Sequence, residues 1–177
     1  MEHEGILLTL AQIAATFIGF TGIVYAFARV SGGAQGSLVG IARFRLRSMV
    51  IAGLQSLMIA ILPFIFLAAG WPDGRVWQAS SLVAIVFLLW SSLFYLRNYI
   101  SLRRDYGAQF VHWLLLGSSL VVFPAMAVLQ LCNVMGWGFG PTFCPFLIAV
   151  EGMLLVTAAI FIILIFRTDA APEKSAD

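Results

Sequence analysis

Residues 145–166 read PFLIAVEGMLLVTAAIFIILIF, an apolar run in which Glu151 is the only charged side chain. A helix needs roughly 20 apolar residues to cross about 30 Å of hydrocarbon, and this stretch is long enough. Four more runs of this kind precede it, at residues 5–28, 46–70, 77–96 and 113–135. We therefore predict an all-α fold, an integral membrane bundle of five transmembrane helices.

The composition of the whole chain agrees with a membrane protein. Of its 177 residues, 62% are hydrophobic and 10% are charged, and the mean hydropathy is +1.00. Soluble domains carry about 25% charged residues, so this chain has too few polar side chains to cover a water-facing surface. We predict a single transmembrane domain over residues 1–167 and a disordered cytoplasmic tail over residues 168–177.

Lys and Arg are unequally distributed between the connections of these five helices. The head, residues 1–4, and the loop 136–144 have none, and the loop 71–76 has only Arg75. The other basic residues lie in the two remaining loops, their flanks and the tail: Arg29, Arg43, Arg45, Arg47, Arg97, Arg103, Arg104, Arg167 and Lys174. Because cytoplasmic loops carry an excess of Lys and Arg, we predict an outside N-terminus and a cytoplasmic C-terminus.

Small residues recur at every fourth position in the first two predicted helices. The two stripes are Ala11, Ala15 and Gly19, with Gly22 close by, and Ser48, Ala52, Ser56 and Ala60. Small residues let membrane helices approach closely, because lipid provides no hydrophobic drive for their association. We expect these stripes to face each other or a second copy of the chain. We also expect kinks at Pro63 and Pro124, and an interhelical hydrogen bond from Gln55.

Four polar side chains are predicted to lie at similar depth in the outer half of the bilayer: Glu151, Gln12, Gln130 and Asn133. A hairpin of the fourth and fifth helices would bring Gln130 within reach of Glu151. An acid inside the membrane is a functional candidate by default, so one hypothesis is that Glu151 binds a cation or relays a proton. The alternative is a protonated, hydrogen-bonded Glu151 that fixes the register of the helices.

A basic ring is predicted at the inner membrane surface, formed by Arg43, Arg45, Arg47, Arg103 and Arg104. Each basic residue near anionic lipid is worth about 1 kcal/mol, so these residues are candidates for binding lipid headgroups. The alternatives are that they only set the orientation of the chain, or that they form an anion-attracting pore mouth. We expect the lipid bilayer and anionic phospholipids as partners, with a homo-oligomer or a second membrane protein as further candidates. We expect no nucleic acid, because no soluble domain or extended basic surface is present.

Cys132 and Cys144 flank the loop between the fourth and fifth helices, on the predicted outer surface. That surface is oxidising in a bacterium, so a disulfide between them is one expectation and two free thiols are the other. Two cysteines cannot complete a structural zinc site, and His3 and His112 fall on opposite sides of the membrane. We expect no metal and no cofactor. The chain has no HExxH, Walker or GxSxG motif, and we expect that it is not an enzyme.

The stretch FIGFTGIV at residues 17–24, followed by RFRLR at 43–47, resembles an uncharacterised family of small bacterial multi-pass inner-membrane proteins. The similarity covers the first two helices and their link. It implies a location in the bacterial inner membrane and assigns no functional residue. We predict a non-enzymatic membrane protein, an accessory, scaffold or sensing subunit that acts through helix, lipid or protein contacts. The alternative is a homo-oligomeric ion channel whose pathway is lined by Gln12, Gln130 and Glu151.

Overall fold

The computed structural model describes residues 2–30, 38–106, 116–138 and 141–166, and the side chains of 4–23, 47–100, 116–138 and 141–162. These parts of the chain form helices: α1 (Glu2–Val30), α2 (Leu38–Ala68), α3 (Asp73–Tyr106), the π-helical turn η1 (Ser118–Val122), α5 (Phe123–Met135) and α6 (Phe143–Phe166). Within the described residues, five segments are long and apolar enough to cross a membrane, η1 and α5 together forming one of them. The expectation of an all-α chain with five segments of membrane-spanning length is confirmed for this part of the chain.

Two of the helices extend beyond the apolar runs that predicted them. The run at 77–96 belongs to α3, which continues to Tyr106, and the run at 46–70 belongs to α2, which begins at Leu38. Hydropathy marks where a helix meets lipid, whereas backbone hydrogen bonding continues for as long as the following residues favour a helix. Four arginines of the predicted basic ring therefore lie on these extensions, Arg43 and Arg45 on α2 and Arg103 and Arg104 on α3. Arg47 lies at the start of the apolar run itself.

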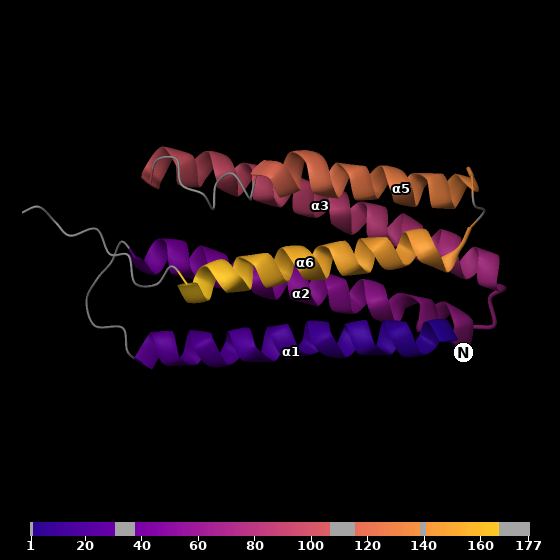
Figure 1. Ribbon diagram of the computed structural model, residues 1–177, viewed down its shortest axis with the longest axis horizontal. Coiled ribbons are helices and arrows are strands. Elements are labelled where there is room, and N and C mark those ends of the chain that lie inside the picture. The colour runs from indigo at the N-terminus through magenta and orange to yellow at the C-terminus, as the bar shows by residue number, and fades with distance from the viewer. Residues whose placement is uncertain (1, 31–37, 107–115, 139–140, 167–177) are drawn as a thin grey trace, which may run out of the picture.

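The long helices run up and down alternately along one axis (Figure 1). The start of α1, the α2–α3 connection and the α5–α6 connection lie at one end of the bundle, and the last turns of α1, α3 and α6 lie at the other. The first of these we call the N-terminal end and the second the arginine end, because Arg47 and Arg97 are exposed near it. An odd number of passes therefore separates the start of α1 from the end of α6.

The connection between α2 and α3 is a tight turn that forces the two helices to be antiparallel. Gly70 has a φ of 76°, a left-handed conformation that glycine adopts without steric cost. The N–H groups of Gly70 and Trp71 donate to the carbonyls of Leu67 and Phe66, at 2.9 and 3.1 Å. These bonds satisfy the last carbonyls of α2, and the Trp71 ring stacks on Phe66 with centroids 4.9 Å apart.

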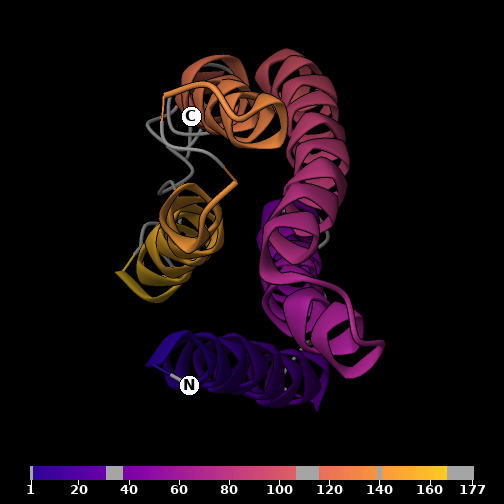
Figure 2. The ribbon, with the colours of Figure 1, turned by 90° about the vertical axis from the view of Figure 1, so that its right-hand side faces the viewer.

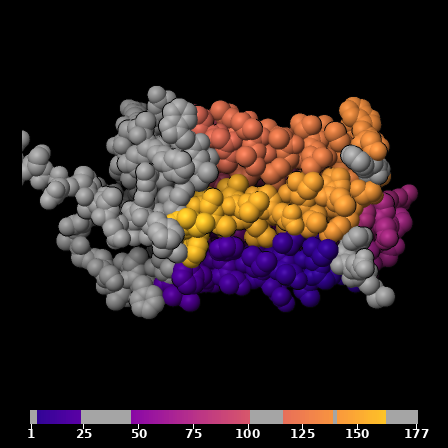
Figure 3. All heavy atoms as spheres, viewed as in Figure 1, coloured from indigo at the N-terminus to yellow at the C-terminus, as the bar shows by residue number. Residues whose placement is uncertain are grey.

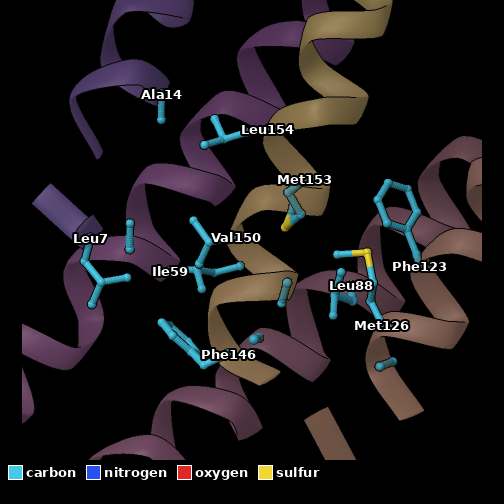
Figure 4. Packing of buried hydrophobic residues seen from close by; sticks show 14 of the residues in the cluster. Leu7, Ala14, Ile59, Leu88, Phe123, Met126, Phe146, Val150, Met153 and Leu154 are labelled. Atoms are coloured by element: carbon cyan, nitrogen blue, oxygen red, sulfur yellow. The ribbon is translucent and has the colours of Figure 1, made fainter. Parts of the chain in front are cut away.

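Helix α6 occupies the open side of a curved layer made by α1, α2, α3 and α5 (Figure 2). On the face shown in Figure 3 it lies between α1 and α5. Figure 4 shows Ile59 of α2 turned toward Val150 and Phe146 of α6, all of them buried. On the other side of α6, Met126 of α5 is so close to Gly152 that an added Cβ would lie 2.6 Å from its methyl carbon.

The two small-residue stripes have different environments. All four residues of the α2 stripe, Ser48, Ala52, Ser56 and Ala60, are buried. A Cβ added to Gly53 of α2 would lie 2.9 Å from Cγ1 of Ile18, so α1 and α2 approach closely there. On α1, Ala11 is buried, but Ala15, Gly19 and Gly22 are exposed. The α1 stripe is therefore buried within the protomer only at Ala11, and contact of its exposed part with a second copy stays a prediction.

The π turn η1 precedes Pro124, which has no N–H to donate. The hydroxyl of Ser92 on α3 provides the missing donor. The N–H of Phe123 donates to the carbonyl of Ser118, five residues earlier, so in this register Pro124 would leave the carbonyl of Ser119 without a donor. The hydroxyl of Ser92 donates to that carbonyl. The sequence prediction assigned the crowded carbonyl to Leu120, four residues before Pro124, because it assumed a regular α-helix. At Pro63, by contrast, α2 continues without a break in its assigned helix.

Candidate functional site

Asn133 of α5 is the centre of a buried hydrogen-bond network that joins three helices. Its Nδ2 donates to the hydroxyl of Ser81 on α3 at 2.8 Å and to the carbonyl of Thr142 at 3.1 Å. Its Oδ1 accepts a hydrogen bond from the backbone N–H of Thr142 at 2.9 Å. Asn133 and Ser81 are both buried. One amide side chain thus connects α5 to α3 and closes the connection to α6.

Gln130, three residues before Asn133 on the same face of α5, connects α5 to α6. It is fully buried, and its Nε2 donates to the carbonyl of Pro145 in the first turn of α6. Its Oε1 has no hydrogen-bond partner among the described residues. Gln78 of α3 donates through Nε2 to the carbonyl of Val134 at 3.3 Å. We call this group the inner polar network; its members are Gln78, Ser81, Gln130, Asn133 and Thr142.

Sequence reasoning found only part of the inner polar network. Gln130 and Asn133 were predicted to share a face, whereas Gln78, Ser81 and Thr142 were missed. The available signal was the three-residue spacing of Gln78 and Ser81, which places two polar side chains on one face of a helix. Thr142 acts mainly through its backbone, so its residue type gave no signal.

The end of α5 directs the chain back toward this network. Gly136 has a left-handed conformation with φ 69°, and the N–H of Trp137 donates to the carbonyl of Cys132 at 2.9 Å. Such a glycine ends a helix and reverses the chain. The connection is then closed by Asn133 and Thr142. Cys132 is half-buried, Cys144 is exposed, and both are free cysteines in the structure.

The hydrogen bonds between Asn133 and Thr142 close the same loop that the disulfide was expected to close. Cys132 precedes Asn133 and is therefore turned about 100° away from it around the axis of α5. Cys144 is exposed on α6, between the buried residues Phe143 and Pro145. A disulfide between the two cysteines stays a prediction, and the closure seen here does not depend on it.

Gln55 makes the interhelical hydrogen bond that its position predicted. Its Oε1 accepts a hydrogen bond from the hydroxyl of Ser91 on α3 at 2.7 Å, and both residues are buried. Closer to the arginine end, the hydroxyl of Tyr95 on α3 donates to the carbonyl of Ser48 on α2 at 3.5 Å. These bonds hold α2 against α3 inside the protomer, so their polar groups contribute to the fold.

Glu151 lies on the outer face of α6. Its side chain is exposed, together with those of Ile148 and Leu155, which are 48% and 71% exposed. Its neighbours along the chain, Val150 and Met153, are buried against the other helices. In a membrane this face of α6 would meet lipid hydrocarbon or another protein.

Gln12 lies on an outer face of α1. Its side chain is exposed, and its backbone carbonyl accepts a hydrogen bond from the hydroxyl of Thr16 at 2.8 Å. Gly5 and Gly19, seven residues before and after it, share this face. No atom lies within 4 Å of a Cβ added at either glycine, apart from their own helix. The face is therefore open at these two glycines, two turns from Gln12, whereas Leu8, one turn from Gln12, is a large exposed side chain.

These positions correct the prediction of one four-residue cluster. The structure brings Gln130 and Asn133 together in the inner polar network, and it leaves Glu151 and Gln12 on outer faces of two other helices. Gln130 and Glu151 do not come together, because Gln130 is fully buried between α5 and α6 whereas Glu151 is exposed on the outer face of α6. The sequence predicted a similar depth for the four residues. The rotation of each helix about its own axis turns Gln130 and Asn133 inward and Glu151 and Gln12 outward.

Of the basic ring, the structure describes the side chain of Arg47 alone, which is exposed. The side chains of Arg43, Arg45, Arg103 and Arg104 lie outside the described residues. Binding of lipid headgroups by this ring stays a prediction. Within the described ranges, no three His, Cys, Asp or Glu side chains come together as ligands for a metal ion.

Comparison of this chain with protein-family models, with curated proteins and with solved structures finds no match. The resemblance of the first two helices to small bacterial inner-membrane proteins therefore stays a prediction. The described residues form a helical protein with five segments long and apolar enough to cross a membrane, with a buried polar network around Asn133 and with Glu151 and Gln12 on outer faces of α6 and α1.

Proposed function

We propose that this chain is a non-enzymatic subunit of the bacterial inner membrane, which acts as an accessory, scaffold or sensing component by binding a partner protein within the bilayer. The observation that carries the proposal is the outward position of Glu151. Its carboxyl group is exposed on a face of α6 that is otherwise apolar, with Ile148 on one side and Leu155 on the other.

The free energy of a carboxyl group in hydrocarbon supports this proposal. An acidic side chain at the centre of a membrane helix costs about 2.5–3.5 kcal/mol on scales of membrane insertion. A hydrogen-bond donor or a cation from a partner helix would offset that cost, and the protomer itself provides none to Glu151 among the described residues. Glu151 is thus better suited to a contact between proteins than to the interior of its own bundle.

The buried polar groups of the bundle differ from Glu151, because they are bonded within the protomer, and this difference favours the same conclusion. Asn133, Gln55 and Ser81 are bonded to neighbouring helices of the same protomer, so they contribute to folding. A polar residue that evolves in a membrane helix without such a partner marks a surface or a pathway. Among the described residues of the apolar helices, Glu151 and Gln12 are of this kind.

An orientation with the arginine end at the cytoplasm completes the proposal. Arg47 and Arg97 are exposed at that end, in agreement with the excess of Lys and Arg in cytoplasmic loops. We expect a phosphatase fused to the N-terminus to be active outside the cytoplasmic membrane, and a fluorescent protein fused to the C-terminus to fold in the cytoplasm. Location of both termini in one compartment would contradict the five-pass topology.

A homo-oligomeric ion channel is the second candidate, favoured by the outward position of both Glu151 and Gln12. Copies arranged around an axis could line a pathway with these two side chains, but not with Gln130, which is buried inside its protomer. Ion flux into liposomes that is lost in Glu151→Ala and retained in Gln55→Ala would support a channel. Absence of flux for any cation would leave the subunit function.

The experiment for the subunit function is recovery of the tagged protein from native membranes in a mild detergent. We expect a complex larger than the monomer that is retained in Glu151→Gln, which keeps hydrogen-bonding groups, and lost in Glu151→Leu. The matched control is Leu93→Ala on α3, which also changes an exposed residue, 57% accessible. A complex that survives Glu151→Leu, or that depends equally on Leu93, would refute the proposal.

A further inference from the structure

We infer that the partner of the Glu151 face is a second copy of this chain, and that Glu151 on α6 of one copy pairs with Gln12 on α1 of the next. This inference rests on the proposed function and names the partner. It follows from three features of the described residues: the depth of the two side chains, the shapes of the two faces, and the chemistry of an amide and a carboxyl group.

The two side chains lie at nearly the same depth. α1 begins at Glu2 and α6 at Phe143, and both helices start at the N-terminal end of the bundle (Figure 1). At 1.5 Å per residue, Gln12 lies about 15 Å along α1 and Glu151 about 12 Å along α6. Two copies standing side by side in one membrane would therefore have the amide and the carboxyl group within about one helical turn of each other.

Contacts between α1 and α6 within one copy support this register and also keep the two side chains apart. The ring of Phe161 on α6 lies 5.8 Å from that of Phe17 and 5.2 Å from that of Phe20. Around the axis of α1, Gln12 is turned about 140° from Phe17 and about 80° from Phe20. Gln12 thus points to the side of its own α6, and its side chain is exposed.

The two faces have complementary shapes. The Gln12 face has the small exposed residues Thr9, Ala15 and Thr16 one turn from Gln12, beside the larger Leu8. Two turns away it has Gly5 and Gly19, each with nothing within 4 Å of an added Cβ. The Glu151 face has the large side chains Ile148 and Leu155, one turn to either side. Close approach of membrane helices needs small residues on at least one of them, because contact is driven by packing and hydrogen bonds. The α1 face of one copy can therefore receive the α6 face of the next.

With a protonated carboxyl group, Glu151 can form two hydrogen bonds with the carboxamide of Gln12. A protonated carboxyl group donates through its O–H and accepts at its carbonyl oxygen, and a carboxamide does the same through N–H and C=O. A deprotonated Glu151 would still accept from the Gln12 Nε2. The pair therefore satisfies both polar groups, which in lipid have no water to bond with.

The contact joins two different faces, so it can be repeated. Each copy offers a Gln12 face and a Glu151 face at the same time. A head-to-tail interface of this kind generates a ring when the rotation closes and a row of copies when it does not. A symmetric dimer, by contrast, would need both faces in one interface, with Gln12 of each copy paired with Glu151 of the other.

The test is disulfide crosslinking between two tagged copies in which Cys132 and Cys144 have been replaced by serine. One copy carries Gln12→Cys and the other Glu151→Cys, and both are expressed in the same membrane and oxidised. We expect a crosslinked dimer that contains both tags. The matched control replaces Gln12→Cys by Ile13→Cys, an exposed position on α1 about 100° around the helix, and should give at least tenfold less dimer.

A second measurement removes the dependence on introduced cysteines. Self-association of labelled protein in lipid vesicles, followed by energy transfer on dilution with lipid, should weaken about tenfold in Gln12→Leu and stay unchanged in Glu151→Gln. Equal crosslinking from Ile13→Cys, or no mixed-tag dimer together with unchanged association in Gln12→Leu, would overturn the inference. If a different protein were then recovered in a complex that depends on Glu151, the proposed function would stand and only the self-association would be refuted. If neither self-association nor such a complex were found, the inference and the proposed function would both be refuted.

Discussion

The inner polar network and the outer pair of Gln12 and Glu151 use similar side chains in opposite ways. Asn133 makes three hydrogen bonds inside its own protomer, to Ser81 and Thr142. Glu151 is exposed on an apolar face. The comparison indicates that polar residues in this bundle have two roles: those turned inward hold helices together, and those turned outward are available to a partner. Substitutions should therefore separate effects on folding from effects on assembly.

The largest effect on folding is expected for Asn133→Leu. The substitution removes three hydrogen bonds and leaves the Thr142 N–H without its acceptor, so we expect the free energy of unfolding to fall by about 2–3 kcal/mol. Thermal unfolding in detergent would measure the change. The control is Leu131→Ala, two positions away on the exposed side of α5. Equal stability of the two variants would show that the network does not hold the helices together.

An intermediate effect is expected where two glycines differ in their surroundings. Gly53→Ala places a methyl group 2.9 Å from Cγ1 of the stiff, branched side chain of Ile18, so we expect a loss of about 1–2 kcal/mol. Gly19→Ala adds the same group in open space and should not lower the stability of the monomer. Chemical unfolding in micelles would compare them. A loss in Gly19→Ala as large as that in Gly53→Ala would contradict the assignment of inner and outer faces.

A smaller effect is expected at the π turn. Ser92→Ala removes the hydroxyl that donates to the Ser119 carbonyl, and interhelical hydrogen bonds of this kind average about 0.6 kcal/mol in membranes. Ser119→Ala is the matched control, because its hydroxyl bonds only to the Leu116 carbonyl of its own segment. We expect a lower unfolding midpoint for Ser92→Ala than for Ser119→Ala. A midpoint for Ser92→Ala at or above that of Ser119→Ala would show that another group satisfies the carbonyl.

The class of fold was predictable because exposing polar groups to lipid costs so much free energy that membrane-spanning segments are almost entirely apolar. Five apolar runs predicted five helices of membrane-spanning length, and the position of Gln55 predicted its bond to Ser91. The ends of α2 and α3 were not predictable from hydropathy, because these helices continue past the apolar runs. The π turn was not predictable either, because Pro124 is equally compatible with an ordinary kink.

The rotation of each helix was the main feature that the sequence could not indicate. In a soluble protein, an amphipathic pattern shows which face is buried. α6 is apolar on nearly all sides, because lipid and the protein interior both accept Leu, Ile and Val. The sequence therefore predicted a depth for Glu151 along the helix, but it held no sign that Val150 and Met153 would be inside while Glu151 would be outside.

Glu151→Leu tests the division between inner and outer polar groups most directly, when stability and association are measured on the same samples. We expect the isolated monomer to unfold within about 0.5 kcal/mol of the original protein, as an exposed substitution should, while self-association in vesicles is lost. The opposite result would contradict the account: a monomer destabilised as strongly as Asn133→Leu, with association unchanged, would place Glu151 among the groups that hold the bundle together.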